Sequence, residues 1–161
     1  MNQLDVLLPA LANRGVQYIV VGGVAAAAHG SARFTRDLDI VYARNRGNLA
    51  RLVDALSPYV PYLRGAPPGL PFCWSVATLE AGLNFTLTTT AGDIDLLGEV
   101  TGGGGYEALL THSIERPVFG VTCRIVTLPT LIALKRAAGR PRDFDAVAEL
   151  EILLDEQQRR H

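Results

Sequence analysis

The amino-acid sequence predicts an α+β fold, with a mixed β-sheet flanked by helices, in a single domain over residues 1–161. Strand-like and helix-like patterns follow one another along the chain without strict β-α-β alternation. The length of 161 residues falls within the range of about 100–200 residues that is usual for one domain. Hydrophobic residues make up 48% and charged residues 19% of the chain, which favours a globular protein with a substantial core.

The first third of the chain contains the clearest secondary-structure patterns. The stretch MNQLDVLLPALAN suits an amphipathic helix, and the β-branched and aromatic run that follows it suits a buried strand. Gly22 and Gly23 interrupt that strand, an alanine-rich helix follows, and Gly30 is placed to end this helix in a left-handed conformation. We expect helices over 2–13, 24–29 and 48–56, and strands over 16–21 and 38–42.

A proline-rich connection follows the last of these helices. Its helix and strand breakers are Pro58, Pro61, Pro67, Pro68, Gly69 and Pro71. So many breakers in one segment predict a long irregular surface loop. Two interpretations of this loop remain open, namely an insertion without a role, and a lid or acceptor-binding element beside a site.

The second half of the chain predicts short strands and then helices. We expect a short helix within 74–81, a hairpin of strands over 83–90 and 94–97, a helix over 106–111, and one or two strands over 118–126. The glycine run at 102–105 is interpreted as a loop inside the domain. Helices over 130–138 and 144–157 should form the C-terminal part of the domain from about residue 129.

The glycine pair after the first strand is a candidate phosphate site. A turn at this point directs free backbone N–H groups and the positive end of a helix dipole toward one place. Gly22 and Gly23 would let a phosphate approach the backbone closely. A glycine pair on its own is usually only a turn, so this interpretation depends on a second motif nearby in the chain.

Two alternating carboxylates begin the next strand. Asp37 and Asp39 share one face of it, while Leu38 and Ile40 point into the core. Because the two like charges repel each other, a cation should lie between them, and hard oxygen ligands suit Mg²⁺. The upstream residues that are placed to contact phosphate oxygens are Arg33, Thr35 and Arg36. The combination predicts a phosphate and metal site much more strongly than either motif alone.

These residues resemble the nucleotidyltransferases of the DNA polymerase beta superfamily, in particular small bacterial members related to toxin-antitoxin and abortive-infection proteins. The family signature is an apolar residue, Gly, Gly or Ser, a spacer, and Asp-apolar-Asp-apolar. The matching positions are Val21, Gly22, Gly23, Asp37, Leu38, Asp39 and Ile40. The segments Gly92–Val100 and Leu131–Leu150 also resemble family elements, whereas Arg44–Leu83 matches no motif. One departure is Ala146, where relatives often carry an acid three residues after the position of Asp143.

The resemblance implies a third carboxylate on a later strand, and two residues are candidates. Asp93 and Asp95 lie two positions apart and face the same side of a strand, so periodicity does not separate them. Asp93 follows Gly92 at the expected hairpin turn, where an aspartate commonly caps backbone N–H groups. Asp95 lies deeper in the strand and needs a compensating cation, so we expect it to be the metal ligand.

The resemblance implies a Mg²⁺-dependent nucleotidyltransferase, with Mn²⁺ as a possible substitute, that moves a nucleoside monophosphate from an NTP such as ATP to an acceptor hydroxyl. The acceptor is expected on RNA or on a partner protein, as in a toxin-antitoxin system. Asp37, Asp39 and Asp95 are the expected catalytic metal ligands. The expected nucleotide-binding residues are Gly22, Gly23, Arg33, Thr35, Arg36 and Lys135, the only lysine of the chain. The alternatives are an inactive module of this fold that neutralises a partner, and an antibiotic nucleotidyltransferase.

Charge and cysteine content narrow the remaining functional classes. A net charge of −1 argues against broad electrostatic binding to nucleic acid. The basic residues of 33–51 and 135–142 are either one positive rim around a triphosphate or RNA end, or, for Arg44–Arg51, a solvated helix face. Cys73 and Cys123 lack metal-type spacing and are expected to be buried without a disulfide partner.

The expected location rests on the apolar segments. The longest nearly apolar run, residues 16–28, is too short to cross a membrane and contains two glycines. The N-terminal stretch carries Asp5 and lacks the basic segment of a signal peptide. We therefore expect a cytoplasmic protein. His29 at the end of the alanine-rich helix is expected to be a helix cap or packed residue rather than a general base.

Overall fold

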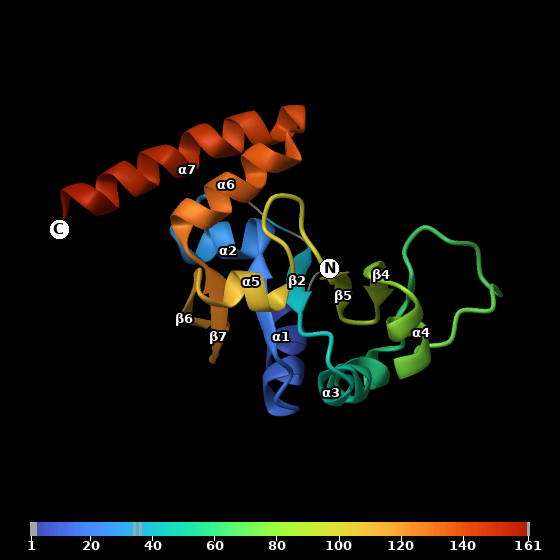
Figure 1. Cartoon of the computed structure of the whole chain (residues 1–161). Coiled ribbons are helices and arrows are strands. Elements are labelled where there is room, and N and C mark those ends of the chain that lie inside the picture. Colours follow the sequence, from blue (N-terminus) through green and yellow to red (C-terminus); the bar gives the residue numbers. More distant parts are fainter. Residues whose placement is uncertain (1–2, 34, 36, 161) are drawn as a thin grey trace.

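The computed structural model describes residues 3–33, 35 and 37–160 and has a seven-stranded sheet with helices on both faces (Figure 1). The helices of the described residues are α1 Leu4–Asn13, α2 Gly22–Ala28, α3 Arg46–Leu56, α4 Val76–Ala81, α5 Tyr106–Leu110, α6 Leu128–Ala138 and α7 Pro141–Arg159. The strands are β1 Tyr18–Val21, β2 Leu38–Tyr42, β3 Tyr62–Leu63, β4 Asn84–Thr89, β5 Gly92–Leu97, β6 Ser113–Val118 and β7 Val121–Val126.

The sheet is mixed, as the sequence predicts. Its strand order is β3-β4-β5-β2-β1-β7-β6. The pairs β2/β5 and β1/β7 are parallel, and the remaining neighbours are antiparallel. The predicted α+β fold with a mixed sheet is therefore confirmed, and the parallel β2/β5 pair joins two segments that are distant in the sequence.

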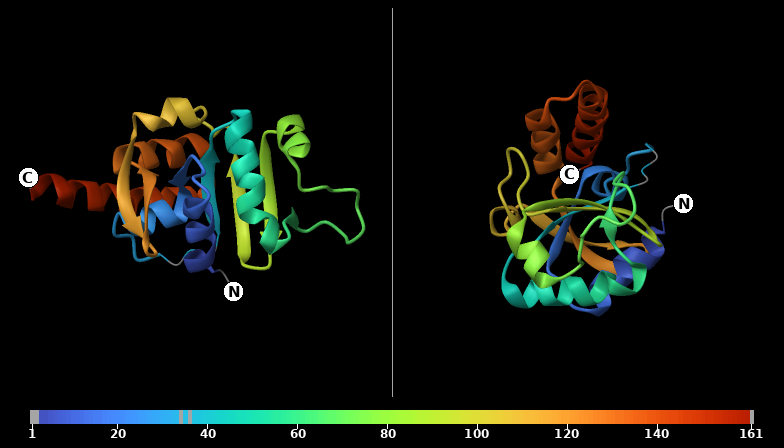
Figure 2. Two further views of the ribbon diagram at one scale, coloured as in Figure 1. Left: turned by 90° about the horizontal axis from the view of Figure 1, so that it is seen from below. Right: turned by 90° about the vertical axis from the view of Figure 1, so that its right-hand side faces the viewer.

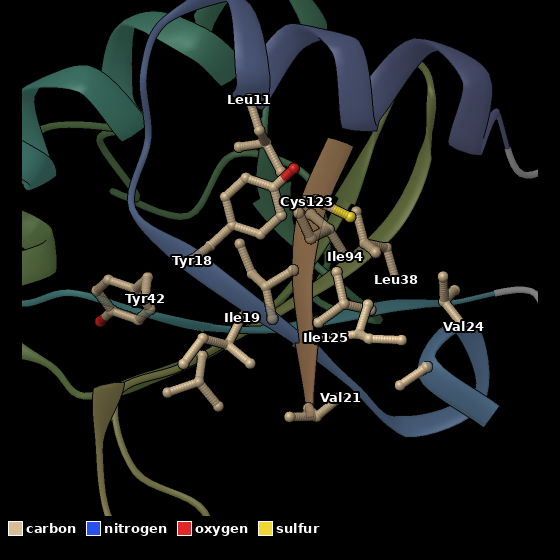
Figure 3. Packing of buried hydrophobic residues seen from close by; sticks show 14 of the residues in the cluster. Leu11, Tyr18, Ile19, Val21, Val24, Leu38, Tyr42, Ile94, Cys123 and Ile125 are labelled. Carbon is tan, nitrogen blue, oxygen red and sulfur yellow. The ribbon is translucent and has the colours of Figure 1, made fainter. Parts of the chain in front are cut away.

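Helices cover the two faces of the sheet in two separate groups. Figure 2 shows α1 and α3 against one face and α2, α6 and α7 on the other. Leu38 and Ile40 of β2 are fully buried, as expected for the core side of that strand. Figure 3 shows Leu11 of α1 near Tyr18 of β1 within the same apolar cluster. Asp39, which lies between Leu38 and Ile40 on β2, therefore faces α2, α6 and α7.

Most predicted elements are present, with shifted ends. The alanine-rich helix begins at Gly22, not at Val24, so the glycine pair forms its first turn. The proline-rich connection was expected to be irregular throughout, but it contains a 3₁₀ turn, Ser57–Tyr59, and the two-residue strand β3. The predicted strand region of 118–126 is a hairpin whose first strand, β6, begins earlier, at Ser113. The two-residue strand β3 depends on pairing with the distant strand β4 rather than on local pattern.

One expectation about side chains needs correction, and one open alternative is decided. Cys73 is exposed because it lies in the connection before α4, whereas Cys123 is buried on β7 as expected, and both cysteines are free. Arg46 and Arg51 are exposed on α3, which covers the face of the sheet opposite α6 and α7. They form a solvated helix face and do not join the basic residues near the end of the chain. None of the helices within the described residues is both long and apolar enough for a membrane span.

Candidate functional site

The candidate site is built on the parallel pair of β2 and β5. The register of this pair places Asp39 directly beside Asp95. Their neighbours Leu38, Ile94 and Leu96 are fully buried on the opposite face. The alternation of both strands thus directs two carboxylates toward α2, α6 and α7, and Asp37 precedes β2 at the same edge.

A pocket of about 370 Å³ lies between these carboxylates and the C-terminal helices. Asp37, Asp39 and Asp95 line it from the sheet. The basic side of the pocket is formed by Lys135, Arg140 and Arg142 from α6 and the start of α7. The fold therefore brings together the three predicted acids and the single lysine, which the sequence separates widely.

Asp39 is the most strongly perturbed acid of the pocket. Burial, followed by the nearby negative charges of Asp95 and Asp37, raises the pKa of its carboxyl to about 7. Its Oδ1 atom is buried and has no hydrogen-bond partner among the described residues. A buried carboxylate oxygen without a partner costs free energy, which a bound cation would recover. These hard oxygen donors fit Mg²⁺ or Mn²⁺.

The donor set is less compact than a closed metal cage. Among residues 3–33, 35 and 37–160, no group of three or more His, Cys, Asp or Glu side chains is gathered closely enough to hold a metal ion unaided. Mg²⁺ commonly takes only one or two protein carboxylates and completes its shell with water and substrate phosphates. Asp39 with either neighbour would therefore supply the protein's share of ligands.

The glycine turn is shaped by its contact with the acids as well as by backbone geometry. Gly22 has a φ of +68°, and a Cβ atom there would overlap the carboxylate of Asp39. A Cβ on Gly23 would lie 2.5 Å from the Oγ1 atom of Thr35. The hydroxyl of Thr35 donates a hydrogen bond to the Asp37 carbonyl. A side chain at either glycine would therefore displace Asp39 or Thr35, a reason for glycine that the sequence pattern did not reveal.

Arg64 is a site residue that sequence reasoning missed. It follows β3, and its Nη2 atom donates to Asp95 Oδ1 at 2.8 Å. Its Nε atom lies 3.2 Å from Asp93 Oδ2, and its Nη1 atom lies 4.0 Å from Asp37 Oδ2. Asp93 was expected to cap the hairpin turn, but it lies within β5 and pairs with Arg64 instead. Only the pairing of β3 with β4 brings Arg64 here, so no local motif identified it.

The basic side of the pocket contains a buried acid of its own. Lys135 is half-buried, and burial lowers the pKa of its ammonium group. The side chain of Arg140 donates to both carboxylate oxygens of Asp143, at 2.7 and 3.2 Å, and these bonds lower the pKa of Asp143. Asp143 in turn accepts from the Arg140 backbone N–H and caps the start of α7. Arg142 also lines the pocket.

The remaining predicted residues differ in their placement. Arg33 lines the pocket, but its Nε atom is paired with Glu149 of α7 at 2.5 Å. Arg36 lies outside the residues that the structure describes. His29 caps the C-terminal end of α2, as expected, and its Nε2 atom lies 2.8 Å from the Val126 carbonyl oxygen. Arg44 donates to the Tyr42 hydroxyl and the Leu79 carbonyl, away from the pocket.

Comparison of the sequence with protein-family models and with curated proteins found no match.

Proposed function

We propose that this protein is a Mg²⁺-dependent nucleotidyltransferase. It would move a nucleoside monophosphate from an NTP to an acceptor hydroxyl on RNA or a partner protein, and release pyrophosphate. The observation that carries this proposal is the pocket in which Asp39 and Asp95 meet across β2 and β5, opposite Lys135, Arg140 and Arg142. Adjacent acids facing a basic wall suit a metal-bound triphosphate, which presents positive and negative charge side by side.

The residues of the pocket divide into two groups by charge. Asp37, Asp39 and Asp95 would hold the divalent cation together with water and phosphate oxygens, and the cation would supply activation of the attacking oxygen and neutralisation of the leaving group. Lys135 and Arg142 supply positive charge for the triphosphate oxygens. The backbone N–H groups at Gly22 and Gly23 begin α2 and favour an anion there.

The transfer reaction balances without any further reactant. The acceptor oxygen forms a bond to the α-phosphorus as the bond from that phosphorus to the bridging oxygen breaks. The electron pair leaves with pyrophosphate, and a carboxylate of the pocket accepts the proton of the acceptor hydroxyl. Positioning and charge neutralisation are the main demands of such a step, and this pocket supplies both kinds of group.

A toxin-antitoxin role is part of the proposal, through the sequence resemblance and the acceptor classes that it implies. The competing possibility is an inactive module of the same fold that neutralises a partner. The Oδ1 atom of Asp39, buried and without a partner in the described part of the chain, counts against it, because a protein freed from catalysis gains nothing from a buried carboxylate beside two others.

Labelled nucleotides test the proposed function directly. The purified protein would be incubated in a cell extract with each NTP labelled at the α-phosphate, together with Mg²⁺ or Mn²⁺. We expect label to enter RNA or protein, and to be absent with the Asp39→Asn variant. Label in a small molecule instead would support antibiotic modification, and no transfer from any NTP would favour the binding module.

A further inference from the structure

Arg64 is fixed at the edge of the acid face by the sheet itself. Its backbone N–H donates to the Thr86 carbonyl at 3.0 Å, which continues the pairing of β3 with β4. Its Nη2 atom donates to the Leu87 carbonyl as well as to Asp95, each at 2.8 Å. Only 26% of its side chain is exposed. The guanidinium is therefore held in place by backbone and carboxylate groups together.

This arrangement places a permanent positive charge against the same carboxylate that the proposed metal would use. The guanidinium group of an arginine carries a positive charge in proteins. It already occupies Asp95 Oδ1 and also contacts Asp93 and Asp37. A divalent cation at Asp39 and Asp95 would meet electrostatic repulsion from this neighbour.

We propose that Arg64 is a built-in counter-ion of the acid site that weakens the binding of a free divalent cation and so makes the cation enter with its nucleotide. This inference rests on the proposed nucleotidyltransferase function. A triphosphate brings negative charge that offsets the repulsion, because it attracts both the metal ion and the guanidinium. Arg64 thereby determines which form of the metal the site accepts, free or bound to a nucleotide.

Direct binding of Mn²⁺ to the full chain tests this role without measuring activity. Arg64→Gln removes the charge, and Arg64→Lys keeps it. Arg124→Gln is the matched control, because Arg124 has a comparably half-buried side chain paired with Glu115 on the β6/β7 hairpin. With Mn²⁺ alone, we expect Arg64→Gln to bind about tenfold or more tightly than wild type, the scale of repulsion between close cations. Arg64→Lys and Arg124→Gln should stay within about threefold of wild type.

Nucleotide analogues complete the comparison. With each of four NTP analogues that carry a methylene bridge between the α- and β-phosphorus, the advantage of Arg64→Gln should fall below about threefold. Arg64→Gln loses the repulsion between the guanidinium and the metal ion, but it also loses the attraction between the guanidinium and the triphosphate, and the two losses offset each other. A folded Arg64→Gln variant with unchanged affinity for free Mn²⁺ would overturn the proposal.

A measurement on the wild-type protein covers the case in which Arg64→Gln does not fold. The NMR signal of the Arg64 side-chain Nε–H should shift when Mg²⁺ is added with the analogue that binds, and stay in place with the same concentration of Mg²⁺ alone. An equal shift with Mg²⁺ alone would refute the counter-ion role. Unchanged Mn²⁺ affinity of Arg64→Gln would refute only the counter-ion role. If Mn²⁺ binds to no form of the protein, with or without analogues, the proposed function fails as well.

Discussion

Asp39 combines three conditions that disfavour its ionised carboxylate. It lies on a central strand, its Oδ1 atom is buried without a partner among the described residues, and the negative charges of Asp95 and Asp37 act on its carboxyl. Burial and repulsion both favour the protonated carboxyl, so its folded-state pKa of about 7 is above the ordinary value of 3.8. Asp39 is thus a source of instability that a cation, or a proton, relieves.

The pH dependence of stability reflects this pKa. Between about pH 4 and pH 7 the folded protein binds a proton at Asp39 that the unfolded chain has lost, so stability falls as pH rises through this window. Asp39→Asn should remove this loss of stability. In metal-free buffer at pH 7.5, its free energy of unfolding should exceed that of wild type by on the order of 2 kcal/mol. Denaturant titrations of both proteins at pH 5 and pH 7.5 measure the effect. If the free energy of unfolding of both proteins changed equally with pH, Asp39 would not be the group responsible.

Asp93 and Asp95 share Arg64 but face different surroundings, so their alanine variants should differ. Asp95→Ala should abolish Mg²⁺-dependent transfer, because Asp95 faces Asp39 in the pocket. Asp93→Ala should retain most of the transfer activity. Its free energy of unfolding should fall by about 1 kcal/mol or less, the usual contribution of a partly exposed ion pair. Parallel transfer assays and denaturant titrations measure both. An active Asp95→Ala beside an inactive Asp93→Ala would reverse the roles.

At the scale of elements, the turn from β1 into α2 is the most constrained connection of the site. Gly22 adopts a left-handed φ of +68° and packs against the Asp39 carboxylate. Gly15, in the turn before β1, has nearly the same φ of +67°, but nothing lies within 4 Å of the position of its absent Cβ. The two glycines therefore separate the cost of backbone strain from the cost of a contact.

Alanine at each of these glycines tests that separation. Gly15→Ala should cost about 1–2 kcal/mol of stability through backbone strain alone. Gly22→Ala should cost at least about 1 kcal/mol more, because the new methyl group displaces the Asp39 side chain, and it should also abolish transfer. Thermal unfolding and transfer assays measure both effects. Equal stabilities for the two variants would show that the contact with Asp39 does not affect the stability of the protein.

The sequence predicted the elements that carry their own local signal. The strands of Asp39 and Asp95 have alternating apolar residues, and Lys135 lies on a helix with a clear apolar side, so their elements and faces were predictable. Arg64 was not predictable, because β3 has only two residues and sits among prolines, where local pattern indicates a loop. The meeting of Asp39 with Asp95 depends on the parallel register of β2 and β5, which no short segment encodes.

For the whole molecule, the site joins the sheet to the C-terminal helices. The pocket has acids on the sheet and basic residues on α6 and α7, so a ligand that bridges them would hold the two parts of the fold together. Arg33 and Glu149 make a similar link between the loop before β2 and α7. Occupation of the site should therefore be visible in global stability.

A bound nucleotide should raise the melting temperature of the entire chain. At a concentration of 100 times its dissociation constant, a ligand that binds only the folded state adds about 2.7 kcal/mol. For a domain of this size, each kcal/mol corresponds to roughly 2–4 °C. We expect this rise with Mg²⁺ and the matching non-hydrolysable NTP analogue, and no rise for Asp39→Asn. Calorimetric scans of wild type and variant provide the test, and an equal rise in both would locate the ligand elsewhere.

The strand order has a consequence for the emerging chain during protein synthesis. The acid pair needs β5 beside β2, and the basic wall needs α6 and α7, which follow β5 in the chain and leave the ribosome after it. A nascent chain that has completed β5 presents these carboxylates with Arg64 as a basic neighbour from the sheet. The pocket is complete only when α6 and α7 dock on the sheet. Until then its acidic and basic sides remain apart, so the proposed transfer reaction would have to wait for this step of folding.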